Sequence, residues 1–71
     1  TPFTLADVMR RDRHRCVACG GGIDVRLPIG DPRSAAIAHD VPIAAGGRHV
    51  LANCRAAHLE HVAAYESRSA A

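Results

Sequence analysis

Apolar side chains recur at helical spacing in two short segments near the two ends of the sequence. Leu5, Val8 and Met9 would form one face of a helix capped by Thr4, with an acidic residue three positions later as in a capping box. We expect this helix to end before the first cysteine. The same spacing returns after the last cysteine and predicts a final helix over about residues 58–68.

The middle of the chain is rich in turn-forming residues and leaves room for two short strands. Proline and glycine interrupt residues 23–34, so we expect a loop there. Residues 35–41 predict a strand, and residues 49–51 predict a second one after a turn at residues 46–47. The pattern therefore predicts a small α+β fold with a hairpin over about residues 35–52.

The composition indicates that such a fold needs more than its apolar core. The chain has 71 residues, which is enough for a single domain over residues 1–71. Of its 71 residues 48% are hydrophobic, but 14 of these are alanine, and the sequence has one Phe, one Tyr and no Trp. A domain this small is usually stabilised by disulfides, a metal ion or a partner chain.

Cysteine usage favours the metal ion. Three cysteines cannot all pair, and a spacing of two residues between the first two is typical of ligands. We therefore expect an intracellular, reducing setting, whether cytoplasmic or phage-associated. No signal-peptide pattern opens the sequence, and no apolar run approaches the roughly 20 residues of a membrane span, so no membrane partner is expected.

Two pairs of residues have the chemistry of a Cys2His2 zinc site. Cys16 and Cys19 precede three glycines and would form a zinc knuckle over residues 16–20. His58 and His61 would lie one turn apart on one face of the final helix. The competing interpretation is two free thiols and two surface histidines. The third cysteine, Cys54, is expected to be a small buried side chain rather than a ligand.

Positive charge gathers before the knuckle. The formal net charge is +2, and all nine basic residues other than histidine are arginine. Arg10, Arg11, Arg13 and Arg15 form a cluster whose planar donor groups suit phosphate, so they are the candidate nucleic-acid contacts. A solvated helix end would give the same pattern without any ligand.

Several short motifs together resemble those of the small HNH endonucleases of phages and actinobacteria. The resemblance runs from about residue 5 to residue 68. It rests on the run from Arg11 to Gly20, on Ile23-Asp24, Leu27-Pro28 and Pro32-Arg33-Ser34, and on Val41-Pro42, Gly46-Gly47 and Asn53-x-Arg55. It implies a ββα-metal fold, treble-clef-like, that carries a zinc knuckle.

The resemblance also assigns catalytic roles. His39 takes the position of the general base that activates water, and Asn53 takes that of the amide that braces the hairpin loop. The family binds a catalytic Mg²⁺ or Mn²⁺ through residues that here are Ala38 and Val62, neither of which has a ligand atom. Asp40 is the nearby candidate for a replacement ligand.

Glu66, one helical turn after Val62, is a second candidate to reach the metal. Two functions remain open from these residues. One is a divalent-metal DNA endonuclease, and the other is a zinc-stabilised binding or assembly module without activity. We expect a nuclease-like domain that binds or acts on DNA with weakened or lost cleavage. A larger protein assembly is the other expected partner, and no small-molecule substrate is expected.

Overall fold

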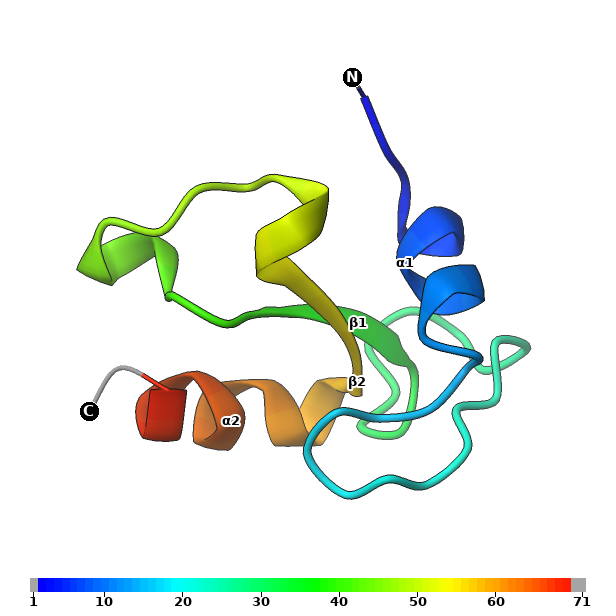
Figure 1. Ribbon diagram of the computed structural model, residues 1–71. Coiled ribbons are helices and arrows are strands. Elements are labelled where there is room, and N and C mark those ends of the chain that lie inside the picture. The colour runs from blue at the N-terminus through cyan, green and yellow to red at the C-terminus, as the bar shows by residue number, and fades with distance from the viewer. Residues whose placement is uncertain (1, 70–71) are drawn as a thin grey trace.

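The structure, a computed structural model, describes residues 2–69, so residues 1, 70 and 71 of the expected single domain lie outside it. The described part is a small α+β unit in which an antiparallel two-stranded sheet lies between two helices (Figure 1). The elements in chain order are α1 (Leu5–Arg11), β1 (Ala35–His39), β2 (Cys54–His58) and α2 (Val62–Ser69). Short 3-10 helices span Ile43–Ala45, Leu51–Asn53 and Leu59–His61. The expected α+β class is confirmed.

The first helix begins where its cap predicts. The Thr4 hydroxyl accepts a hydrogen bond from the Asp7 N–H at 3.3 Å, and the Thr4 N–H donates to the Asp7 carboxylate at 2.8 Å. These two bonds complete a capping box, which satisfies two backbone donors that the first turn would otherwise leave free. The helix ends at Arg11 with Asp12 as its C-cap, so both expected ends are confirmed.

The second strand is not where the pattern predicted it. It spans Cys54–His58, and it pairs with β1 in a register that joins Ala35 to His58 and His39 to Cys54. The expected strand at residues 49–51 is wrong because that segment has little to bury: Val50 and Leu51 are 41% and 39% exposed. By contrast, Cys54 and the two alanines of β2 are fully buried. The glycine pair therefore lies inside a long connection over residues 40–53.

The final helix begins four residues later than expected. His58 is the last residue of β2, with extended backbone angles, and a 3-10 turn follows before α2 begins at Val62. The expectation that His58 and His61 share one helical face is therefore wrong. The two side chains converge instead because the strand end and the 3-10 turn bend the chain around the same point.

The core is small, and alanine is its most frequent residue. Val8 and Met9 of α1 pack into one cluster with residues of the sheet and the knuckle, and the buried members are Val8, Met9, Cys16, Ile23, Ala38, Cys54, Ala56 and Ala57. Residues 12–34 wrap around this core without a helix or a paired strand, apart from one isolated bridge between Arg15 and Gly22. No helix within residues 2–69 is long and apolar enough to cross a membrane.

Candidate metal centre

The four expected ligands come together in space. The ligand atoms of Cys16, Cys19, His58 and His61 all lie within 4.8 Å of one another. The Cys16 sulfur is 3.7 Å from His61 Nδ1, and the Cys19 sulfur is 3.5 Å from His58 Nδ1. A tetrahedral zinc ion, with its usual bond lengths to sulfur and nitrogen, would place these atoms about 3.5 Å apart. The quartet is therefore positioned to hold a metal ion, consistent with structural zinc.

The knuckle holds its two sulfurs with backbone hydrogen bonds. The Cys16 N–H donates to the Gly21 carbonyl and the Gly20 N–H donates to the Cys16 carbonyl, each at 2.8 Å, which closes a tight turn. Gly20 has a φ of 74°, a left-handed conformation that glycine adopts at little cost. The Gly21 N–H also points at the Cys19 sulfur at 3.4 Å. The turn thus both bends the chain and stabilises negative charge on sulfur.

Each histidine of the quartet is oriented by a partner on its far side. His58 Nε2 lies 3.1 Å from the Gly22 carbonyl, and His61 Nε2 lies 3.6 Å from the Glu60 carboxylate. The Gly22 carbonyl favours the His58 tautomer that carries its proton on Nε2, which leaves the Nδ1 lone pair facing the Cys19 sulfur. His61 Nδ1 faces the Cys16 sulfur, to which it donates a hydrogen bond when it carries a proton and which it joins as a ligand when it does not. Both imidazoles therefore present the correct atom to an ion.

The Cys16 sulfur is prepared to ionise. Burial alone would raise the pKa of the thiol, but hydrogen bonds from the His58 N–H and from His61 outweigh it. With further backbone donors at Cys19 and Ala18, they lower the pKa to about 6. Because thiolate is the form of cysteine that binds metal, the fold favours the binding form near neutral pH. No disulfide links the three cysteines, all of which are free.

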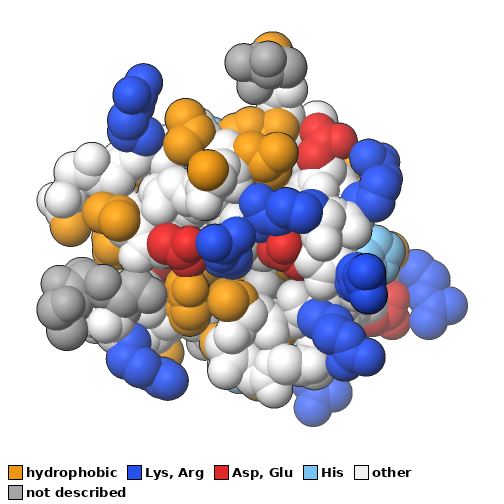
Figure 2. Space-filling view, viewed as in Figure 1, with side chains coloured by type: hydrophobic (Ala, Val, Ile, Leu, Met, Phe, Trp, Pro, Cys, Tyr) orange, Lys and Arg blue, Asp and Glu red, His pale blue; other side chains and the backbone are white. Residues whose placement is uncertain are grey.

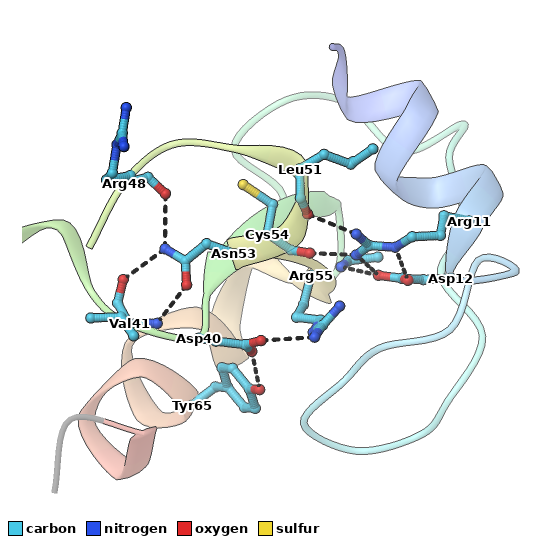
Figure 3. Close-up of polar contacts among 11 residues, drawn as sticks. Arg11, Asp12, Asp40, Val41, Arg48, Leu51, Asn53, Cys54, Arg55 and Tyr65 are labelled. Carbon is cyan, nitrogen blue, oxygen red and sulfur yellow. Dashed lines mark hydrogen bonds and ion pairs between the residues drawn. The ribbon is translucent and has the colours of Figure 1, made fainter. Parts of the chain in front are cut away.

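The expected catalytic residues His39 and Asn53 lie at the opposite end of the sheet, near the connection over residues 40–53. Asn53 braces that connection: its side-chain oxygen accepts from the Val41 N–H at 2.8 Å, and its amide donates to the carbonyls of Val41 and Arg48 at 3.0 and 2.9 Å (Figure 3). This geometry agrees with the bracing role expected of Asn53. Ala38 is fully buried and Val62 is partly buried.

Asp40, the expected replacement ligand, already has two partners. One carboxylate oxygen accepts from the Tyr65 hydroxyl at 2.6 Å, and the other pairs with the Arg55 guanidinium at 2.8 Å (Figure 3). Glu66 does point inward, but it accepts from the His39 N–H at 3.0 Å and lies 3.3 Å from His39 Nδ1. Both carboxylates are therefore committed to other groups rather than grouped around one cation.

The arginine cluster divides into an inward and an outward part. Arg11 pairs with Asp12 at 2.7 Å and donates to the carbonyls of Leu51 and Cys54, so it ties α1 to the start of β2. Its hydrogen bond to Asp12 lowers the pKa of that carboxyl, more than burial raises it. Arg11 is thus a structural side chain in this fold.

The outward arginines are exposed and gather beside the knuckle. Arg13 and Arg15 line a shallow depression together with Arg26, which sequence reasoning did not single out. Arg10 lies in the last turn of α1, does not line this depression, and pairs with Asp7 at 3.4 Å. Figure 2 shows several basic side chains along one edge of the molecule. No local pattern in the sequence identifies Arg26 as a member of this group, because only the folded loop brings it next to Arg13 and Arg15.

Comparison with known proteins gave no similar protein. No protein-family model, curated protein or solved structure matches the chain.

Proposed function

We propose that this chain is a zinc-stabilised, HNH-type domain that binds DNA and has lost efficient phosphodiester cleavage. The order β1, β2, α2 with a Cys2His2 quartet around the end of the sheet supports a ββα-metal arrangement. The observation that carries the binding proposal is the depression lined by Arg13, Arg15 and Arg26. An intracellular setting fits three free cysteines.

Zinc is the ion that suits the quartet best. Two thiolates and two imidazoles in tetrahedral reach are the ligand set of structural zinc sites, which differ from catalytic sites in having four protein ligands. No position is left for water or substrate once all four side chains bind. The role we propose for this ion is therefore to hold the knuckle against the end of β2.

The depression suits a nucleic-acid backbone because its cations are exposed and only weakly held; the Arg15 guanidinium, for example, donates one hydrogen bond to the Gly20 carbonyl at 3.2 Å. Arg13 and Arg15 are exposed, and neither forms an ion pair within residues 2–69. Arg26 pairs with Asp24 at 3.1 Å, but its side chain is 88% exposed, and such surface pairs are weak. A phosphate could therefore replace the carboxylate as the partner of Arg26 at small cost.

Removing the two outward arginines should weaken DNA binding in a salt-dependent way. For the variant Arg13→Ala/Arg15→Ala, the slope of log K against log salt should fall by about 0.9 for each lost phosphate contact. Fluorescence anisotropy with a short duplex, measured at several salt concentrations, gives this slope. Arg11 is left intact because its loss would disturb the fold.

The matched control removes the same charge elsewhere. Arg48 and Arg68 are exposed and do not line the depression, so Arg48→Ala/Arg68→Ala should keep the wild-type slope. Equal slopes for wild type and both double variants would contradict the proposed interface. In that case the second function, a zinc-stabilised module that binds protein in an assembly, would be favoured.

Loss of cleavage follows from the groups around His39. Phosphodiester cleavage needs a cation to offset the charge that develops on the phosphate, and Ala38 and Val62 offer that cation no ligand. Asp40 is held by Arg55 and Tyr65. General-base catalysis by His39 alone is worth only about 10²–10⁴-fold and cannot replace the metal.

We therefore expect no nicking of supercoiled plasmid DNA by the wild-type chain with Mg²⁺ or Mn²⁺. Agarose gels of plasmid incubated with the zinc-loaded protein would measure it, with a His39→Ala preparation as the control for contaminating nuclease. Nicking by wild type that disappears in His39→Ala would overturn the proposed loss of cleavage. Loss of nicking in Asp40→Asn or in Glu66→Gln would then identify the residue that binds the catalytic cation.

A further inference from the structure

A second group of metal-ligating side chains converges at the other end of the sheet. His39 Nε2 lies 3.0 Å from His49 Nδ1, and the Cys54 sulfur lies 3.8 Å from the same His49 nitrogen. The three ligand atoms all lie within 4.8 Å of one another. His39 and Cys54 are directly opposite each other in the sheet register, so their side chains share one face, and His49 reaches them from the connection over residues 40–53.

The three side chains are held in place by their surroundings. The Glu66 carboxylate lies 3.3 Å from His39 Nδ1 and also accepts from the His39 N–H, an arrangement that places the imidazole proton on Nδ1 and the lone pair on Nε2. The His49 ring stacks on Phe3 with ring centroids 4.9 Å apart. The Asn53 amide holds the carbonyl of Arg48, the residue before His49. The site is therefore built before any ion arrives.

We propose that His39 Nε2, His49 Nδ1 and Cys54 Sγ bind a second metal ion, a divalent transition metal such as Zn²⁺. Two imidazoles and a thiolate suit this class of ion, whose tetrahedral geometry places the two nitrogens about 3.4 Å apart and the sulfur about 3.5 Å from each. With three protein ligands, the fourth position takes water or an external ligand. Cys54 is fully buried and His49 is exposed, so the ion lies at the rim of the core.

This site extends the role of Cys54 beyond that of a buried side chain. It also occupies His39 Nε2, the ring nitrogen that is not paired with Glu66. The site does not depend on DNA binding, because none of its ligands lines the arginine depression. The competing arrangement is a hydrogen bond between His39 Nε2 and His49 Nδ1. It needs one proton between the two nitrogens and no metal ion.

Metal content separates these arrangements. After equilibration with excess Zn²⁺ and a weak competing chelator, we expect two equivalents of Zn²⁺ per wild-type chain. Inductively coupled plasma mass spectrometry would measure this content. The variants His49→Ala and Cys54→Ala should each bind one equivalent. His49→Ala is the safer variant, because His49 is exposed, and circular dichroism checks that each variant keeps its fold.

The fifth histidine provides the matched control. His14 is exposed and belongs to neither cluster, so His14→Ala should keep two equivalents. One equivalent in the wild type, or two in a folded His49→Ala variant, would overturn the proposal. An equal loss in His14→Ala and His49→Ala would show binding by surface histidines and would also overturn it.

Cobalt reports on the ligands themselves. Titration with Co²⁺ should give a second equivalent whose thiolate-to-cobalt absorption disappears in Cys54→Ala, while the first equivalent keeps the absorption of its two thiolates. A second equivalent with unchanged absorption in Cys54→Ala would exclude Cys54 as a ligand and contradict the three-residue site.

Discussion

Chelation of the metal ion that the quartet of Cys16, Cys19, His58 and His61 is positioned to hold is expected to unfold the domain. Within residues 2–69 the fully or nearly buried core has only eight members, and three of them are alanine, so apolar burial contributes little. A core of this size rarely supplies more than about 3–5 kcal/mol, whereas zinc binding to small zinc domains contributes about 10–16 kcal/mol. Far-UV circular dichroism during thermal unfolding, before and after chelation and again after Zn²⁺ is restored, would measure the effect.

The second proposed ion must be separated from the first in this experiment. His49→Ala lacks the second site but keeps the quartet, so chelation should unfold this variant as completely as the wild type. Cys19→Ser and His61→Ala should be unfolded or strongly destabilised even with Zn²⁺ present. An unchanged cooperative transition after verified metal removal would contradict the stabilising role of the quartet.

Gly47→Ala is expected to be among the most damaging substitutions of a single residue outside the quartet. A Cβ atom at this position would lie 1.8 Å from the Val41 carbonyl oxygen and 2.8 Å from that of Pro42. Both are backbone atoms and cannot turn aside like a flexible side chain. The connection over residues 40–53 would have to move, at a cost of about 3 kcal/mol or more in the free energy of unfolding. Urea unfolding in saturating Zn²⁺ would measure it.

Gly22→Ala is the matched control for this substitution. A Cβ atom at Gly22 would meet nothing within 4 Å, and its φ is not in the left-handed region, so its stability should be unchanged or slightly raised. Gly47→Ala should also lose the second metal equivalent, because His49 lies two residues away in the same connection. A Gly47→Ala variant as stable as Gly22→Ala would show that this connection tolerates a displacement.

Local signals in the sequence were sufficient for the elements that depend on neighbouring residues. The capping residues Thr4 and Asp7 determine where α1 begins, because both partners lie within one helical turn. The spacing of Cys16 and Cys19, and of His58 and His61, was enough to pair them as one site, because metal ligands have few chemical alternatives.

The tertiary structure alone decided where β2 lies and which polar side chains meet. Residues 49–51 and 54–58 are both short, and only packing against α1 and β1 selects the second as the strand. The same pairing brings Cys54 opposite His39 and places the carbonyls of Leu51 and Cys54 where Arg11 donates to them. These contacts join residues 10 or more positions apart, or depend on a neighbouring element for their direction. No local pattern encodes them, because their energy arises only when the elements pack.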